Sequence, residues 1–498
     1  MIGFANKKIE DKILQRTGIV DIGSNTIRLV VFEGPSRSPR YFYNEKVNCE
    51  LGIGLRRTGY LSAKGQKKAF KAIQRFNTVL KTMNIVEIYF VATSAVRDAK
   101  NGKEFIEIIE KKFKIKIYVI SGKDEGVLAA SGVLLGVPKA TGIVCDIGGS
   151  SLELAYLENG KIKITQSFEL GPLALQDYQK IGKSKREVIT KKLSKINKSF
   201  PSNINSLFLV GGCWRAMAKI HMNLTDYPLK VLQGYKVLVN KFDSTIENIS
   251  NSKTSELLKI TSSSEERVKL LPDACKVLKV IYEKFCPKEL FFSGYGIREG
   301  IFFSQFSDKI RKLNPLLQAC SYLEQNRSRY PGFGRTLYEW LLPIFPEIGN
   351  SQKELFLAAC YLHDTIWQAH PDYRSEVCFE TVTGANLGGV DHSGRIFLAL
   401  SLMSRYKKTD FNKIDKKYLL LLNAKKIKEA IILGACMRLG AMLSVNIKEN
   451  LRKTKIYTKE NIIYLKLIKE DNLLGDSVEK RFNHLGNLMN LKSKIILV

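Results

Sequence analysis

Two short segments of the sequence carry residue types that bind phosphate. Residues 19–26 read IVDIGSNT and residues 144–151 read VCDIGGSS, so the second segment is an approximate copy of the first. Turns of this composition leave backbone N–H groups pointing at an anion, and hydroxyl and amide side chains add further donors. The candidate phosphate-binding residues are Gly23, Ser24, Asn25 and Thr26 in the first copy and Gly148, Gly149, Ser150 and Ser151 in the second.

The aspartate inside each copy, Asp21 or Asp146, would lie beside the anion. A carboxylate is tolerated there when a cation such as Mg²⁺ bridges it to phosphate oxygens. Alternatively, each aspartate accepts hydrogen bonds from the N–H groups of its own turn. One such turn could be a plain hairpin, but two copies at the same place in repeated halves would face each other across a cleft, which favours phosphate binding.

A third candidate is Glu125, in the segment ISGKDEG at residues 120–126. The segment opens a helix after a strand, and Ser121 with Asp124 has the spacing of a variant capping box. The residues alone favour Glu125 as a carboxylate that interacts with the helix dipole over Glu125 as a catalytic base.

The elements that must position these residues alternate between strand and helix. The predicted strands are 27–32, 86–93, 115–120, 152–157, 206–210 and 289–293, and the predicted helices are 64–83, 102–113, 124–135, 184–196 and the start at 214–221. This alternation predicts a mixed α/β fold with related lobes at 1–138 and 139–312. Beyond residue 312 the apolar spacing is helical, in 316–325, 333–342, 354–367, 394–405 and 427–443. A third, all-helical domain is therefore expected at 313–498.

The composition is that of a basic globular protein. The 498 residues include 79 Lys and Arg against 48 Asp and Glu, a net charge of +31. Such a field attracts polyanions, although codon bias explains it equally well. The most basic end is 401–498, with 21 basic and 9 acidic residues. The nine cysteines include no C-x-x-C pair, which favours reduced thiols and a cytoplasmic location. The absence of an apolar stretch near 20 residues argues against a membrane span.

Five ordered motifs give the sequence a family resemblance. They are the two D-I-G segments, the second continuing to Glu153, together with ATSAVRDAKNG at 92–102, the turn at 120–125 and SGYGIREG at 293–300. Over residues 17–310 the chain resembles the exopolyphosphatase/guanosine pentaphosphate phosphohydrolase family, whose members share the fold of actin, sugar kinases and heat-shock chaperones. The resemblance implies two actin-like lobes with a cleft between them.

The resemblance also implies an activity, the release of terminal phosphate from inorganic polyphosphate or guanosine pentaphosphate. Glu125 would be the general base that activates water, and Arg97 would be the cleft arginine. Asp146 and Glu153 would surround Mg²⁺, and Arg267 would bind the polyanion. No membrane and no specific nucleic acid is expected as a partner, and a homodimer is possible.

Some positions depart from the family pattern. Ser150 stands where a third glycine is usual and Leu152 where threonine is usual, so a weaker phosphate grip is expected. His363 and Asp364 resemble the signature of an HD-like domain, but no histidine lies between residues 312 and 363 to complete a metal site. We therefore expect a structural or chain-guiding helical domain, with His363 in its core.

Two other classes of function stay open. A kinase or ATPase of the same superfamily would place Gly211 and Gly212 near an adenosine, whereas here Cys-Trp-Arg follows that pair and a glutamate occupies the base position. A non-catalytic binder of polyphosphate or nucleic acid is favoured by the charge. Glu125 argues against it, because an acid in a phosphate-lined cleft repels the ligand unless it has chemistry to perform.

Overall fold

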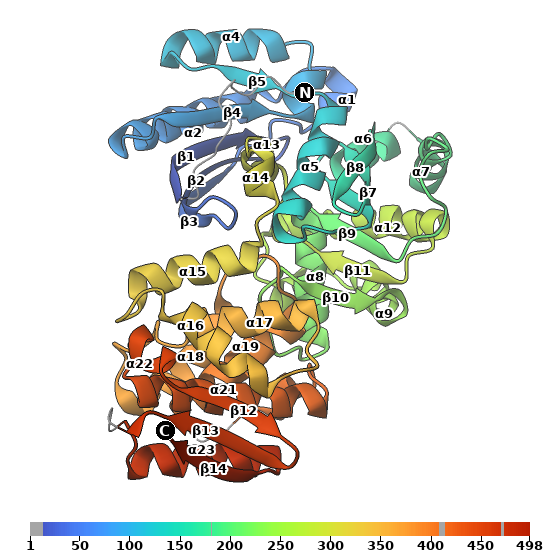
Figure 1. Ribbon diagram of the computed structural model, residues 1–498. Helices are drawn as coiled ribbons and strands as arrows, with labels where there is room; N and C mark the ends of the chain where they lie inside the picture. The colour runs from blue at the N-terminus through green and yellow to red at the C-terminus, as the bar shows by residue number, and fades with distance from the viewer. Residues whose placement is uncertain (1–12, 181, 408–413, 470–472) are drawn as a thin grey trace. The chain divides into compact units, whose positions relative to one another are not determined.

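The chain divides into two compact units, Met1–Pro315 and Leu316–Val498, which are described separately. This computed structural model describes residues 13–180, 182–407, 414–469 and 473–498 (Figure 1).

The first sheet of the N-terminal unit has the strand order β3-β2-β1-β4-β5. Its strands are β1 (Ile13–Ile22), β2 (Thr26–Pro35), β3 (Arg40–Asn48), β4 (Glu87–Ala92) and β5 (Ile117–Val119). The first three form an antiparallel meander, while β4 and β5 run parallel to β1. The helices of this half are α1 (Leu55–Thr58), α2 (Ala63–Thr82), α3 (Ser94–Asp98), α4 (Gly102–Phe113) and α5 (Gly122–Gly136).

The second sheet repeats the meander and has the order β10-β11-β9-β6-β7-β8. Its strands are β6 (Gly142–Ile147), β7 (Leu152–Glu158), β8 (Lys161–Phe168), β9 (Ser206–Val210), β10 (Tyr235–Leu238) and β11 (Glu289–Phe292). The helices of this half are α6 (Pro172–Lys180), α7 (Lys185–Leu193), α8 (Gly212–Leu224), α9 (Val239–Asn251), α10 (Thr254–Ile260), α11 (Glu265–Val268), α12 (Leu271–Phe285), α13 (Ile297–Ser304) and α14 (Asp308–Arg311). Two mixed sheets with this arrangement form the expected pair of actin-like lobes.

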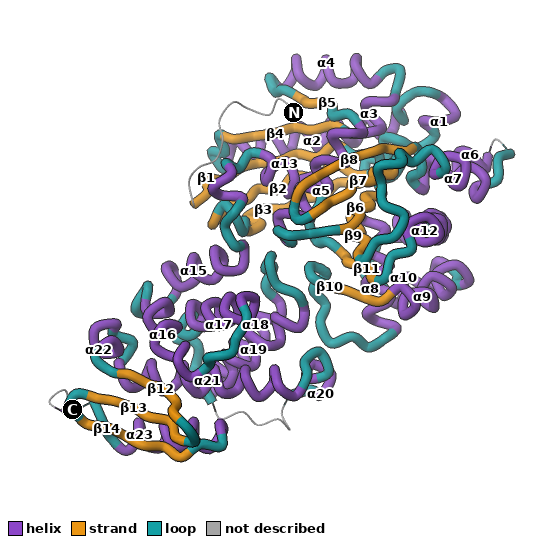
Figure 2. Tube along the Cα trace, turned by 45° about the vertical axis from the view of Figure 1, so that its right-hand side comes forward, coloured by secondary structure: helices purple, strands orange, loops and turns teal. Residues whose placement is uncertain are grey.

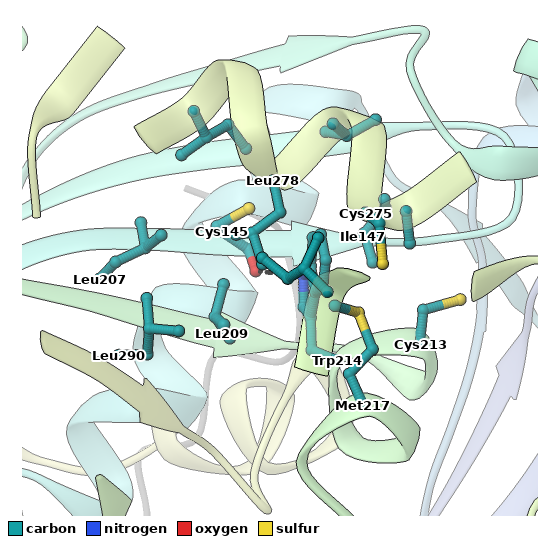
Figure 3. Close-up of a cluster of buried hydrophobic side chains, with 14 of the residues drawn as sticks. Cys145, Ile147, Leu207, Leu209, Cys213, Trp214, Met217, Cys275, Leu278 and Leu290 are labelled. Carbon is teal, nitrogen blue, oxygen red and sulfur yellow. Dashed lines mark hydrogen bonds between the residues drawn. The ribbon is translucent and has the colours of Figure 1, made fainter. Parts of the chain in front are cut away.

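The period-two alternation of the strands supplies three apolar cores. On one face of the first sheet, Val20 and Leu29 pack with α2 and α4. On the other face, Ile19 and Val30 share a core with α5, α13 and residues of the second sheet. The far face of the second sheet packs against α8, α9 and α12 around the fully buried Trp214, whose indole N–H donates to the Cys145 carbonyl at 3.1 Å (Figure 3).

Helices α5 and α13 cross at glycines, which fixes the helix that carries Glu125. A Cβ on Gly300 would lie 1.8 Å from the Leu128 carbonyl oxygen, and a Cβ on Gly132 would lie 2.2 Å from the Gly296 carbonyl oxygen. Only glycine permits backbones to approach this closely.

The C-terminal unit is largely helical. Its α-helices are α15 (Pro315–Arg327), α16 (Phe333–Leu341), α17 (Asn350–Leu362), α18 (Arg374–Gly384), α19 (His392–Tyr406), α20 (Lys416–Leu419), α21 (Ala424–Ser444), α22 (Lys448–Arg452) and α23 (Asp476–Met489). Short 3₁₀ helices occur at η1 (Leu342–Ile344) and η2 (Pro371–Tyr373). Within the described residues, no helix has the length and apolar character needed to cross a membrane.

The C-terminal unit also contains a three-stranded sheet, so the expectation of an all-helical domain needs correction. Its strands are β12 (Lys455–Lys459), β13 (Ile462–Leu467) and β14 (Lys492–Leu497), in the order β12-β13-β14 (Figure 2). The physical reason is that apolar residues of β13 alternate with period two, which suits a strand that buries one face. Ile463, Leu465 and Leu467 are buried, while the residues between them are only half-buried. The helix expected at 354–367 also ends early, at Leu362.

Candidate active site

The two small-residue turns have the same backbone hydrogen bond. In the first turn, the N–H of Gly23 donates to the Thr26 carbonyl at 3.0 Å, and in the second the N–H of Gly148 donates to the Ser151 carbonyl at 3.0 Å. Several N–H groups of the turns have no acceptor within the described part of the chain, those of Ser24, Asn25, Gly149, Ser150 and Ser151. These donors can bind oxyanions.

The two turns also touch each other. The hydroxyl of Ser150 donates to Ser24 Oγ at 3.2 Å, and Ser24 Oγ lies 3.1 Å from Ser94 Oγ. A Cβ on Gly149 would lie 3.1 Å from the Ser24 Cβ. The hydroxyls of Ser150 and Ser24 therefore join the lobes, and Ser150 and Ser151 lie behind the cavity wall, although they were expected on it.

One cavity, with about 170 Å³ of space accessible to water, is lined by most of the residues that the sequence singled out. Residues 23–26, Gly148 and Gly149 line it together with Asp21, Glu125 and Asp146. Five cationic side chains from five different elements also line it, Arg28, Lys46, Arg215, Arg267 and Arg298. Of these cations, only Arg267 was named as a site residue from the sequence. The wall therefore combines anion-binding groups with carboxylates.

The aspartates of the two copies pair with residues of different charge on the neighbouring strand. Asp21 pairs in register with Arg28, whereas Asp146 at the equivalent position pairs with Glu153. Residues directly opposite each other on antiparallel strands share a face. In addition, Arg298 Nη1 lies 3.5 Å from Asp21 Oδ2. The protein thus neutralises Asp21 with its own cations but places two carboxylates side by side in the second lobe.

The carboxyl groups of Asp146 and Glu153 are both buried and both hold their protons more strongly than exposed carboxyl groups do. Burial raises the pKa of Asp146 to about 6, and burial together with the neighbouring Glu125 and Asp146 raises the pKa of Glu153 well above its ordinary value. Glu153 Oε1 accepts a hydrogen bond from Ser167 at 2.9 Å, while its buried Oε2 has no partner in the described structure. Carboxylate oxygens suit Mg²⁺, which takes one or two of them and fills its shell with water and phosphate oxygens.

Larger clusters of metal-binding side chains are not found in the ranges that the structure covers. The described residues hold no group of three or more His, Cys, Asp or Glu side chains placed to bind a metal. Asp146 lines the cavity, whereas Glu153 is not among the residues of its wall.

Glu125 lies in the first turn of α5 and lines the cavity with a nearly buried side chain, 4% exposed. The N-cap is Ser121, whose Oγ accepts the Asp124 N–H at 3.1 Å, as the capping spacing predicted. Burial raises the pKa of Glu125 to about 8; Arg97 opposes this increase and Asp146 adds to it. The carboxyl group is therefore a much weaker acid than an exposed glutamate.

Arg97 contacts Glu125 and does not itself line the cavity. Its Nη1 donates to Glu125 Oε2 at 3.1 Å and to the Ile120 carbonyl at 3.0 Å, and its Nε donates to Asp98 Oδ1 at 3.0 Å. These bonds fix the guanidinium behind the Glu125 carboxyl group.

The glycine pair at the start of α8, Gly211 and Gly212, makes room for an arginine. A Cβ on Gly212 would lie 2.6 Å from Arg267 Cζ, and a Cβ on Gly211, where φ is +117°, would lie 3.0 Å from Asp146 Oδ1. The guanidinium of Arg267 thus occupies the space next to Gly212, at the first residue of α8.

In the C-terminal unit, the side chains of His363 and Asp364 are buried and contact polar groups of the same unit. His363 is buried, with Nδ1 2.7 Å from the Cys360 carbonyl oxygen and Nε2 3.2 Å from Asn446 Oδ1. Burial lowers its pKa to about 4. Arg329 binds both oxygens of Asp364, at 2.6 and 3.0 Å. The histidine is a core residue whose neutral ring carries one N–H and so donates one of these two hydrogen bonds, and the aspartate belongs to an ion pair.

Comparison with known proteins adds to this geometry. The Ppx/GppA phosphatase family matches residues 30–309, and the family described as exopolyphosphatase, C-terminal, matches residues 316–496. Retrograde regulation protein 2 of Saccharomyces cerevisiae is 23% identical over 453 residues, which cover 82% of this chain and 75% of that protein. Exopolyphosphatase 1 of Mycobacterium tuberculosis is 28% identical over 159 residues, 31% of this chain and 46% of that protein.

Solved structures share the fold. A crystal structure of an exopolyphosphatase from Cytophaga hutchinsonii aligns with a TM-score of 0.53 and 23% identity, covering 59% of this chain and 99% of that one. The Ppx/GppA family member of Aquifex aeolicus aligns with a TM-score of 0.50 and 22% identity, covering 58% and 97%. Since the first family match spans more than half of the sequence, the chain belongs to the Ppx/GppA phosphatase family.

Proposed function

We propose that this protein is an exopolyphosphatase, which releases terminal orthophosphate from inorganic polyphosphate by the attack of water. The observation that carries the proposal is the composition of this cavity, which is lined by residues of two small-residue turns, by five cations and by the buried carboxyl group of Glu125. Family membership supports phosphatase chemistry of this kind.

The cavity residues can bind a phosphoanhydride end. The free N–H groups of the two turns would donate hydrogen bonds to oxygens of the terminal phosphoryl group, since backbone N–H groups in such turns bind anions. Arg215, Arg267 and Arg298 would neutralise the charge of this group and its neighbour in the chain. Phosphoryl transfer depends mainly on positioning and charge neutralisation, so these contacts supply most of what the reaction needs.

Glu125 would accept the proton of the attacking water. Its pKa near 8 gives a base whose strength is close to the working pH, where general bases are most effective. Arg97 holds the carboxyl group through Oε2. We propose that Asp146 and Glu153 hold Mg²⁺, which when bound would neutralise charge on phosphate oxygens.

A regulatory protein that binds phosphate chains without cleaving them is the second candidate. It is favoured by the name of the yeast relative, retrograde regulation protein 2, whose match covers 82% of this chain. A kinase has less support, because Arg267 fills the space next to Gly212 where the kinase hypothesis places an adenosine. Guanosine pentaphosphate presents the same terminal anhydride as polyphosphate and is the alternative substrate. We propose a cytoplasmic location, where nine free cysteines are expected.

A phosphate-release assay tests these choices. The purified chain is incubated with Mg²⁺ and long-chain polyphosphate, guanosine pentaphosphate or ATP, and both orthophosphate and any phosphorylated acceptor are measured. We expect orthophosphate release with the highest kcat/KM for polyphosphate. Binding of polyphosphate without release would support the regulatory candidate, and phosphate transfer to an acceptor would support the kinase.

A further inference from the structure

Glu299 is a buried carboxylate to which the proposed reaction gives no role. It lies in the first turn of α13 and is 1% exposed. The preceding residue, Arg298, lines the cavity, whereas Glu299 is not among the residues of the cavity wall. A buried carboxylate is costly unless hydrogen bonds and opposite charges compensate it, so the groups around Glu299 indicate what it does.

Two hydrogen bonds fix the Glu299 carboxyl group. The N–H of Gly296, the N-cap of α13, donates to Glu299 Oε2 at 2.6 Å. The hydroxyl of Tyr41, on β3 of the first sheet, donates to Glu299 Oε1 at 2.9 Å. Both oxygens therefore accept hydrogen bonds, which suits the ionised form of the side chain. The carboxylate is held between the start of its own helix and the first sheet.

Arg298 lies between this carboxylate and Asp21. Its Nε is 3.9 Å from Glu299 Oε1, and its Nη1 is 3.5 Å from Asp21 Oδ2. Both distances exceed those of charge-assisted hydrogen bonds, which are about 2.7–2.9 Å. The buried Nε has no hydrogen-bond partner in the part of the chain that the structure describes. The two carboxylates thus attract the guanidinium from two sides and leave its N–H donors available to a ligand.

Arg298 is also close to the carboxylate of the second turn. Burial raises the pKa of Asp146, and Arg215 and Arg298 oppose this increase. The guanidinium of Arg298 is therefore near the aspartates of both turns, where the terminal phosphoryl group is expected. A cation that is already fixed at this place stabilises charge that develops during the reaction without first reorganising. Its position should then affect the chemical step as well as binding.

We propose that Glu299 is a positioning residue for phosphate release, which acts on the transferred phosphoryl group through Arg298. The inference rests on the proposed function, because it assigns a role within the same reaction. The alternative is that Glu299 only caps α13. Such a cap is present at α10, where the N–H of Lys253 donates to Oε2 of the exposed Glu256 at 2.9 Å, with no cavity residue beside it.

The test measures kcat and KM for orthophosphate release from radiolabelled long-chain polyphosphate, so that slow release is still detected. The proteins are the wild-type chain, Glu299→Gln, Arg298→Met, the double variant and, as a matched control, Glu256→Gln. In Glu299→Gln, kcat should fall about tenfold or more, because Arg298 loses its position. KM should stay the same or fall, since the cavity becomes more positive. In the Arg298→Met background, Glu299→Gln should change kcat by about twofold at most. The control should change neither constant.

Tyr41→Phe gives the same comparison if Glu299→Gln does not fold. It keeps the charge of Glu299 and removes one of its two hydrogen bonds, so kcat should fall by less and KM should not change, again only when Arg298 is present. Equal losses of kcat with and without Arg298 would assign Glu299 to capping and overturn the inference, as would a wild-type kcat in both variants. A wild-type chain that releases no orthophosphate would overturn the proposed function, and this inference with it.

Discussion

Replacing Glu125 with glutamine should change how the stability of the N-terminal unit depends on pH. Burial raises the pKa of this carboxyl group from about 4.5 to about 8. Between these two values the folded chain keeps a proton that the unfolded chain has lost, so the unfolding free energy falls as pH rises through this range. The glutamine side chain does not titrate and is free of this cost.

The magnitude follows from the pKa. Each pH unit within the range costs about 1.4 kcal/mol, so the wild-type chain should lose about 3 kcal/mol more than Glu125→Gln between pH 6 and pH 9. Asp146 and Glu153 are present in both proteins, but Asp146 raises the pKa of Glu125 and Glu125 raises that of Glu153, so the measured difference includes this coupling. Above pH 9 the difference should stay constant.

Urea unfolding at pH 6 and pH 9 measures this difference in a metal-free and phosphate-free buffer. Trp214, buried in the N-terminal unit, reports on that unit alone when Trp340 and Trp367 are replaced by phenylalanine. The prediction is a gap between variant and wild type that widens by about 3 kcal/mol from pH 6 to pH 9. A gap of the same size at both pH values would refute the reasoning that burial raises the Glu125 pKa.

Three further predictions concern neighbouring groups. Arg97→Met should move the acid limb of the pH–rate profile of phosphate release to higher pH, because Arg97 lowers the Glu125 pKa, and Arg97→Lys should move it less; unchanged profiles would contradict this role. Asp146→Asn should raise the Mg²⁺ concentration for half-maximal release by about tenfold or more, and full activity in excess chelator would exclude the cation. Gly300→Ala should lower the melting temperature and the rate, since its Cβ would lie 1.8 Å from a carbonyl of α5, while Gly384→Ala, with open space around it, should change neither.

Local patterns predicted much of the N-terminal unit. The helix expected at 124–135 is α5 (Gly122–Gly136), and the helix expected at 64–83 is α2 (Ala63–Thr82). The repeated segments form equivalent turns, because the same residue types close the same hydrogen bond. Periodicity, capping and turn chemistry are properties of neighbouring residues, and so the sequence reveals them.

The cations of the cavity were harder to predict because tertiary structure brings them together. Arg28, Arg215 and Arg298 come from β2, α8 and α13 and meet only after the sheets form. One signal was nevertheless present: when the two copies are aligned, Arg28 falls on the position of Glu153. Because of this difference, the aspartate of the first copy faces an arginine, whereas the aspartate of the second copy faces a second carboxylate.

The small sheet of the C-terminal unit was missed for a different reason. Its strands are short, and the helices around them dominate the apolar pattern. The strand β13 (Ile462–Leu467) does alternate, with Ile463 and Leu465 buried, but six residues give a weak signal next to helices of 15 or 21 residues.

The role of Glu125 in hydrolysis is tested most directly by the rate of orthophosphate release from polyphosphate by the wild-type chain and by Glu125→Gln, with binding measured in parallel. At pH 8.5 with saturating Mg²⁺, the glutamine variant should lose about 10²-fold to 10⁴-fold in rate, because it cannot accept the proton of the attacking water. It should still bind polyphosphate, since the turns and the cavity arginines are unchanged. A rate within about tenfold of wild type would contradict the assignment of Glu125 as the base.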